Sequence, residues 1–310
     1  MFEGTQSEIP TLDQLMDLIE LKNRTVWDRY FERRHVESWL DNFKGDICER
    51  DYERRLALWL LLNFVYYNYE EVRHLCLILF KKYIHKRLIE SNGGGSTMNE
   101  RIASVLRKVQ FAQLGFPSES SGCLLYYFRQ ENDLSIGNFH KYFKPEKDKS
   151  KEQETEEIAF IDDNTLSGRQ ADSYIGIQGK NDELANKKIS LLTFIASYEA
   201  IERLEKKNIE VFSCIKLGER DKCFSTDSIV FRDFPSCRNE AKKISEHYGS
   251  KICPDIPLGY SDGQCLFGFF YNTPDNTLPI FWGEKEGWQP ILIRHDKKYS
   301  KGYDTDERFF

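Results

Sequence analysis

The stretch from Ile158 to Gln170, IAFIDDNTLSGRQ, constrains the fold of this chain more than any other segment. Its four apolar residues predict a buried strand, and two aspartates follow directly at the carboxyl end of that strand. A short loop with Ser167 and Gly168 then leads into a predicted helix. A buried strand that joins a helix through a short polar loop is typical of an α/β domain with a largely parallel sheet.

Similar apolar runs recur along the second half of the chain and alternate with amphipathic segments. We predict five strands: Cys123–Phe128, Ile158–Ile161, Ile189–Ile195, Ile209–Ile215 and Cys265–Tyr271. Helices fit between several of them, among them Ser197–Lys207, which begins at a serine cap, and Pro235–Tyr248, which ends before Gly249. In sheets of this kind ligands bind beyond the carboxyl ends of the strands.

The first part of the chain predicts helices instead. Apolar residues repeat at helical spacing from residue 11 onward, and the segment 51–67 becomes apolar on all sides, which indicates a buried helix. Thr97 and Glu100 form a capping box for a helix over 98–113. We therefore expect an all-α domain over 1–113, followed by an α/β domain over 114–310.

Composition excludes several classes of protein. Hydrophobic residues make up 40% of the 310, which is enough for a packed core. The balance of 44 basic and 50 acidic residues, 44 − 50 = −6, argues against nonspecific coating of nucleic acid. The polar start predicts no signal peptide, and the longest apolar run is too short to span a bilayer. Eight cysteines without C-x-x-C or zinc-finger spacing predict reduced thiols in a cytoplasmic protein without a membrane partner.

The residues after the Ile158 strand suit a phosphorylated sugar. Loop N–H groups and a helix N-terminus can hold a phosphate, while Ser167 adds a hydroxyl and Gly168 permits close approach of the backbone. The carboxylates of Asp162 and Asp163 can accept hydrogen bonds from ribose hydroxyls or hold Mg²⁺. An aspartate pair that merely caps a turn explains the same residues, and physical chemistry alone leaves both interpretations open.

This segment resembles the phosphoribosyl pyrophosphate (PRPP) motif of type I phosphoribosyltransferases. It is closer still to the D-D-x-x-G-S-G-x-Q string of the phosphoribosyltransferase-like domains of bacterial conflict systems, the PRTase-CE type. The matching residues are Asp162, Asp163, Ser167, Gly168 and Gln170. Leu166 departs from the string, because a glycine is usual at that position.

Two later stretches carry the same resemblance. Pro257–Asp262 reads PLGYSD and Asn272–Trp282 reads NTPDNTLPIFW. They are similar to the family's ending "L-G-Y … N-T-P-N-N-T-L-P-I-F-W", with Asp275 in place of the commoner asparagine. The helices of the first part also look like the helical region of that family, so the resemblance covers most of the chain.

The resemblance implies a type I phosphoribosyltransferase-like fold and a role for each motif residue. Asp162 and Asp163 would be catalytic, would bind the ribose hydroxyls of PRPP or a nucleotide, and would hold Mg²⁺. The residues that would cradle the 5′-phosphate are Asn164, Thr165, Ser167, Gly168, Arg169 and Gln170. Ser121 and Gly122, just before the first predicted strand, would form a pyrophosphate loop. Asn272 and Asn276 either shape turns or recognise the base or another ligand.

Two further segments have both an ordinary and a functional interpretation. Residues 144–157, KPEKDKSKEQETEE, form a solvated surface loop by composition, whereas the resemblance suggests a mobile catalytic lid. The cations Lys81, Lys82, Lys86 and Arg87 suit a solvated helix end. They also suit a nucleic-acid contact in which Tyr83 stacks on a base.

Three functions are therefore expected from different classes. The first is an enzyme that acts on PRPP or a nucleotide at the ribose anomeric carbon, which the resemblance extends to a toxic effector of antiphage defence. The second is a non-catalytic sensor of such a ligand. The third is an adaptor that binds nucleic acid or protein through Lys81–Arg87. Because some relatives are encoded beside retrons, a reverse transcriptase with its noncoding RNA is a possible partner.

Overall fold

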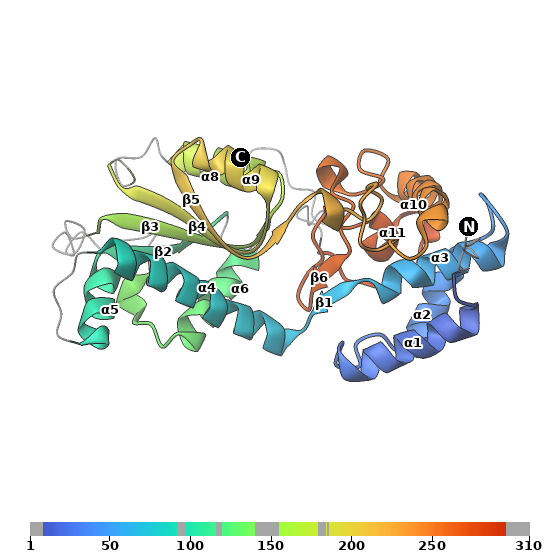
Figure 1. The fold of residues 1–310 in the computed structure, drawn as a ribbon, viewed down its shortest axis with the longest axis horizontal. Helices are drawn as coiled ribbons and strands as arrows, with labels where there is room; N and C mark the ends of the chain where they lie inside the picture. Colours follow the sequence, from blue (N-terminus) through green and yellow to red (C-terminus); the bar gives the residue numbers. More distant parts are fainter. Residues whose placement is uncertain are drawn as a thin grey trace, which may run out of the picture. The chain divides into compact units, whose positions relative to one another are not determined.

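The computed structural model describes residues 9–91, 97–115, 120–139, 155–178, 184 and 186–295. It divides the chain into two compact units (Figure 1). One unit combines Met1–Tyr66 with Ser236–Phe310, and the other is the continuous segment Tyr67–Pro235. The boundary expected between residues 113 and 114 falls inside the continuous unit.

The continuous unit contains a four-stranded sheet in which all neighbouring strands are parallel and the order is β2-β3-β4-β5. The strands are β2 (Val109–Gln113), β3 (Glu157–Thr165), β4 (Lys188–Ser197) and β5 (Ile209–Leu217). Three of the predicted apolar strands, those that begin at Ile158, Ile189 and Ile209, are confirmed. The expected α/β class with a parallel sheet is confirmed with them.

The named strands follow chain order across the sheet. Phe111 in β2 pairs with Ala159 in β3, and it also forms an isolated parallel bridge with Phe139. In open α/β sheets ligands bind beyond the carboxyl ends of the strands.

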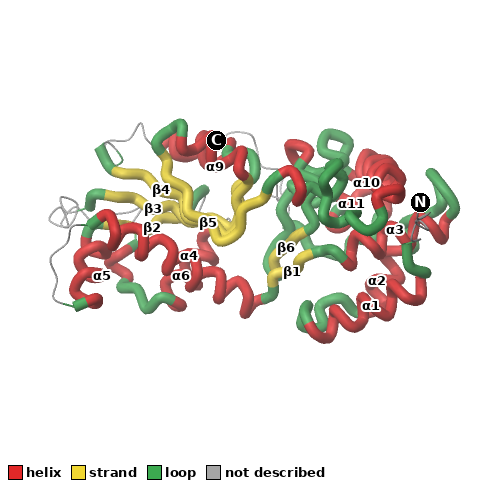
Figure 2. The backbone as a smooth tube through the Cα atoms, viewed as in Figure 1, coloured by secondary structure: helices red, strands yellow, loops and turns green. Residues whose placement is uncertain are grey.

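Helices cover both faces of this sheet (Figures 1 and 2). The helices α4 (Tyr69–Glu90) and α6 (Ser120–Glu131) pack on one face, with α5 (Met98–Arg107) beside them. The helices α8 (Arg169–Gln178) and α9 (Tyr198–Glu205) pack on the opposite face. Thr97 and Glu100 form the predicted capping box of α5, and Ser197 caps α9 as predicted.

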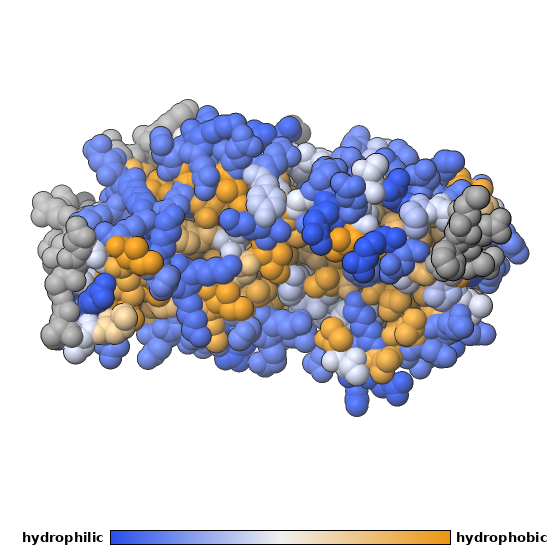
Figure 3. Space-filling view, viewed as in Figure 1, coloured by the Kyte–Doolittle hydropathy of each residue, from blue (hydrophilic) through white to orange (hydrophobic). Residues whose placement is uncertain are grey.

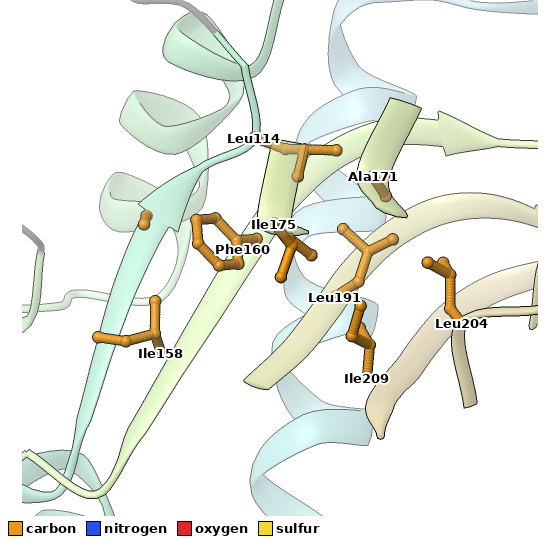
Figure 4. Close-up of a cluster of buried hydrophobic side chains, with 9 residues drawn as sticks. Leu114, Ile158, Phe160, Ala171, Ile175, Leu191, Leu204 and Ile209 are labelled. Carbon is orange, nitrogen blue, oxygen red and sulfur yellow. The ribbon is translucent and has the colours of Figure 1, made fainter. Parts of the chain in front are cut away.

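Apolar side chains fill the space between the sheet and α8 and α9 (Figure 4). Phe160, Leu191 and Ile209 project from three neighbouring strands toward Ile175 of α8 and Leu204 of α9. All five are less than one tenth exposed. Their burial fixes α8 and α9, and with them the loops at the carboxyl ends of β3 and β4.

Two predictions at the start of this unit are wrong. The run Cys123–Phe128 lies in α6 and not in a strand, because burial falls on Leu124 and Phe128, four positions apart. The helix predicted over 98–113 ends at Arg107, and the five residues from Val109 form β2. The sequence pattern therefore placed the first strand of the sheet one element too late.

The other unit is mainly helical and contains a two-stranded sheet, β1-β6. Its elements are α1 (Leu12–Thr25), α2 (Arg33–Leu40), α3 (Arg50–Leu62), β1 (Val65–Tyr67), α10 (Arg238–Ile252), β6 (Phe267–Phe269) and α11 (Pro279–Trp282). Trp39 joins the two chain segments of this unit, since its indole N–H donates to the carbonyl of Ile280 at 2.7 Å and its ring stacks on Phe281.

Three boundaries in this unit differ from the predictions. The helix predicted over 51–67 ends at Leu62, and residues 65–67 form β1. The strand predicted over Cys265–Tyr271 shrinks to β6, which pairs with β1 and does not join the parallel sheet. The helix predicted to end before Gly249 continues through it to Ile252. Glycine is required at this position because a Cβ there would lie 2.1 Å from the Pro257 carbonyl oxygen.

The surface and the cysteines agree with a folded chain with free thiols. All eight cysteines are free. Among the described residues, no helix combines the length and the apolar character needed to cross a membrane. On the face drawn in Figure 3, apolar side chains form separate patches among hydrophilic ones.

Candidate functional site

The candidate site begins with a step at the carboxyl edge of the parallel sheet. The last residue of β2, Gln113, pairs with Ile161, whereas β3 continues beside β4 as far as Thr165, which pairs with Ala196. The two aspartates that follow Ile161 therefore lie where the neighbouring strand has ended.

Asp162 and Asp163 are both buried, each with 7% of its surface exposed. Because successive side chains of a strand point to opposite faces, Asp162 shares the face of Phe160 and Asp163 shares the face of Ile161. The carboxylate of Asp163 accepts a hydrogen bond from the amide of Asn164 at 2.7 Å. Burial of two adjacent carboxylates is unfavourable unless polar groups or cations meet them, so the pair is a specialised feature of this edge.

The loop after β3 has only three residues, Leu166 to Gly168. Gly168 has a φ of +69°, and a Cβ there would lie 3.1 Å from the Arg203 side chain and 3.3 Å from the Ala200 backbone. Both the left-handed backbone and the lack of space require glycine. Leu166 is outside the set of described residues with positive φ, so this loop accepts leucine at the position where the related string has glycine.

The helix α8 begins directly after this loop. Arg169 and Gln170 occupy its first turn and are exposed, while Ser167 accepts a hydrogen bond from the Arg169 N–H at 3.4 Å. Asn164 and Thr165 are the last two residues of β3. The predicted succession of strand, loop and helix is thus confirmed, and it presents a helix N-terminus, which favours anions, beside two carboxylates.

Ser121 and Gly122 lie in the first turn of α6 and do not precede a strand. The Ser121 side chain is 1% exposed, and its hydroxyl donates to the carbonyl of Leu114 at 2.6 Å. Because β2 comes before α6, this serine still borders a loop at the carboxyl edge of the sheet. Its hydroxyl bonds the first turn of α6 to Leu114, which follows β2, and the sequence pattern does not indicate this contact.

Asn272 and Asn276 belong to the other unit. The Asn276 amide donates to the Tyr260 carbonyl at 2.9 Å, and the Asn272 side chain accepts from the His295 N–H at 3.2 Å. A Cβ on Gly259 would lie 2.2 Å from the Asn276 carbonyl oxygen, so the two family motifs of this unit pack directly together. Both side chains thus bond to backbone groups distant in the sequence, while turn formation and ligand recognition stay predictions.

The basic cluster at the end of α4 is not the solvated patch that we expected. Arg87 is 6% exposed, and its Nε and Nη2 donate to both carboxylate oxygens of Glu157 at 2.8 and 2.7 Å. Its Nη2 also donates to Glu210 at 2.7 Å. Tyr83 is fully buried and donates to Glu157 at 3.1 Å, so it cannot stack on a base. Lys81, by contrast, is exposed.

The remaining lysines of the cluster also have partners within the unit. Lys82 donates to the carbonyl of Ser213 at 3.0 Å, and Lys86 forms an ion pair with Glu210. Glu157 was expected to end a solvated loop, but it begins β3 and is buried. The rest of that loop, up to residue 154, lies outside the described residues.

The ionic cluster at the amino ends of the strands shifts the pKa values of its members. Burial raises the pKa of Glu210, but hydrogen bonds from Arg87, Lys86 and Lys188 outweigh it and lower that pKa to about 2. Burial alone would lower the pKa of Arg87, yet its bonds to Glu157 and Glu210 raise it above the ordinary value. Burial and the Glu157 charge raise the pKa of Tyr83. All these groups favour the charged ion pairs with a neutral tyrosine.

The aspartate pair does not form a complete metal cage. No group of three or more His, Cys, Asp or Glu side chains capable of holding a metal ion occurs among the residues that the structure describes. Mg²⁺ is commonly bound through one or two carboxylates together with substrate phosphates and water. Mg²⁺ binding by Asp162 and Asp163 together with a phosphorylated substrate stays a prediction.

These features define an α/β unit whose phosphate-type loop and acidic pair lie at the carboxyl edge of a parallel sheet. A comparison with protein families identifies the group more closely, since the model of the PRTase-CE family matches residues 36–294. The chain belongs to this family, as its motifs predicted, and the match spans segments of both units. Comparisons with curated proteins and with solved structures gave no match.

Proposed function

We propose that this protein is a phosphoribosyltransferase-like enzyme that acts on PRPP or a nucleotide at the anomeric carbon of the ribose. The observation that carries the proposal is the buried pair Asp162 and Asp163 beside the Gly168 loop, at the carboxyl edge of the parallel sheet. Membership of the PRTase-CE family supports a phosphoribosyltransferase-like role. A type I phosphoribosyltransferase-like topology is part of this proposal.

In this proposal each part of the site has its own task. The backbone from Ser167 to Gln170 binds the 5′-phosphate with loop and helix N–H groups, and Asn164 and Thr165 support the start of that loop. Asp162 and Asp163 accept hydrogen bonds from the ribose hydroxyls and stabilise positive charge that develops on the ribose ring. A bound Mg²⁺ would neutralise charge on the phosphates of the substrate.

The biological setting follows from the family resemblance alone. We propose a toxic effector of antiphage defence in the cytoplasm, with a reverse transcriptase and its noncoding RNA as a possible partner. Because Arg87 is buried, a contact with nucleic acid through α4 would be left to Lys81, Lys82 and Lys86. This smaller set makes the adaptor function the weaker alternative.

Calorimetry with PRPP and with ribonucleoside 5′-monophosphates, each in the presence of Mg²⁺, tests the proposal. We expect wild-type protein to bind at least one of them and the variant with Asp162→Asn and Asp163→Asn to lose at least tenfold in affinity, since several charge-assisted hydrogen bonds disappear. The exposed Glu202→Gln of α9 is the matched control and should bind normally. Absence of binding by the wild type contradicts the proposal.

Untargeted nucleotide metabolomics after induction separates the enzyme from a sensor. An enzyme should deplete a phosphoribosyl compound in cells with the wild type and not in cells with the double aspartate variant. Ligand binding by the purified protein without any change in metabolites would instead favour the sensor.

A further inference from the structure

The loop after β3 is attached to the start of the next helix on the same face of the sheet. Ser197 is the last residue of β4 and the N-cap of α9. Its hydroxyl donates to the carbonyl of Leu166 at 2.5 Å, and the same oxygen accepts from the Ala200 N–H at 2.9 Å. One side chain therefore joins the first residue of the loop to the first turn of α9.

The register of the sheet explains why these two residues meet. Thr165 and Ala196 form the last pair between β3 and β4, so the next residue of each strand lies beside the other. At the far end of the loop, Gly168 packs closely on Ala200 of the same helical turn. The loop is thus held at both ends by the first turn of α9, once by a hydrogen bond and once by close packing.

A hydrogen bond to the Leu166 carbonyl fixes the orientation of the peptide unit that ends in the Ser167 N–H. The peptide plane is rigid, so the direction of the carbonyl also sets the direction of that N–H. Leucine at this position lacks the conformational freedom of the glycine that related strings have there, and an external anchor preserves the loop's shape.

We propose that Ser197 is a positioning residue of the phosphate-binding loop, which it holds in the form that receives the 5′-phosphate of a phosphoribosyl compound. This inference rests on the proposed function. Ser197 acts through the loop and does not itself contact the ligand. No motif in the sequence marked it for this role, because its only sequence signal was that of a helix cap.

Three variants test the inference by calorimetry with PRPP and ribonucleoside 5′-monophosphates in the presence of Mg²⁺. Ser197→Ala removes the anchor and should weaken binding about tenfold, as expected for a hydrogen bond that orients the loop N–H groups that donate to a charged ligand. Ser197→Thr keeps the hydroxyl and should bind like wild type. Thr97→Ala removes the equivalent cap of α5, outside the candidate site, and should lower the melting temperature to a similar degree without weakening binding.

The outcomes separate the inference from the function on which it rests. If wild type binds and Ser197→Ala binds equally well, the positioning role is wrong and the proposed function stands. If Thr97→Ala weakens binding as much as Ser197→Ala, loss of a cap alone explains the effect and the inference fails. If wild type binds none of the probes, both the proposed function and the inference fail.

Discussion

The two ends of the parallel sheet use charge in opposite ways. At the amino end, Arg87 meets the carboxylates of Glu157 and Glu210, so opposite charges compensate one another and attach α4 to the strands β3 and β5. At the carboxyl end, Asp162 and Asp163 are consecutive acidic residues of β3, next to a helix N-terminus. One strand, β3, thus begins with a carboxylate that serves the fold and ends with a pair that suits a ligand.

This contrast shows why burial alone does not identify a functional carboxylate. Glu157 and both aspartates have nearly the same exposure, between 6% and 7%. Only the surroundings distinguish them, since Glu157 has a bidentate arginine while the aspartates border a loop whose Gly168 has no room for a side chain. Substitutions at each end of β3 test this difference separately.

The largest effect is expected at the amino end. Arg87→Met should lower the free energy of unfolding by about 3–5 kcal/mol, because it leaves the buried Glu157 without its counter-charge. Urea unfolding followed by circular dichroism measures this. Lys86→Met is the matched control, since this exposed lysine pairs with Glu210 and its loss should cost about 1 kcal/mol or less. Equal effects of the two substitutions would contradict a special role of the buried arginine.

The next effect is expected at the carboxyl end. Gly168→Ala should destabilise the protein by about 1–2 kcal/mol, because alanine disfavours the left-handed backbone and its Cβ would press on Ala200. It should also weaken PRPP binding, and by more than partial unfolding would explain, because the added Cβ displaces the loop that binds the phosphate. Thermal unfolding and calorimetry on one preparation check both parts. Normal binding with reduced stability would limit Gly168 to a structural role.

A smaller, pH-dependent effect should appear at the amino end. The pKa of Glu210 is lowered from 4.5 to about 2, so its ionised form is preferred by the folded state. The stability that this carboxylate contributes is present above pH 4.5 and is lost as the pH falls toward 2. The difference in unfolding free energy between wild type and Glu210→Gln should therefore shrink between pH 5 and pH 2. A difference that stays constant over this range would contradict the assignment.

The smallest effect is expected inside α8. Gly176 lies in this helix and, apart from the backbone of the helix itself, no atom of the described residues lies within 4 Å of the place where a Cβ would be. Gly176→Ala should therefore raise the free energy of unfolding by about 0.5–1 kcal/mol, since alanine is the better helix former. Its effect should be opposite in sign to that of Gly168→Ala in the same denaturation assay. A loss of stability would show that α8 does not tolerate a side chain there.

The part of the site that could be predicted from the sequence is the part that is local. The apolar run, the acidic pair, the glycine and the following helix are consecutive, and each has its own short-range signal. The β2 strand could not be predicted in the same way, because five residues after a capped helix look like its continuation. The helix α6 carries an apolar run that suits a strand equally well, and only its burial at four-residue spacing decides between them.

The pairing of Arg87 with Glu157 could not be predicted because the residues are 70 positions apart and meet through packing of α4 on the sheet. Each of them had a simpler local explanation, as a helix-end cation and as part of a charged loop. The same holds for Ser197, whose capping role was visible while its bond to Leu166, 31 positions away, was not.

The discontinuous unit, built from both the early and the late part of the chain, has a consequence for the order of folding during synthesis. Trp39 and Phe43 leave the ribosome long before the partners that bury them, Phe281 and Trp288, have been made. The continuous unit, made in between, can complete its sheet first. The aromatic side chains of the early helices therefore stay exposed until the segment with Phe281 and Trp288 has been synthesised. Nascent chains stalled within the continuous unit should be the ones that chaperones bind.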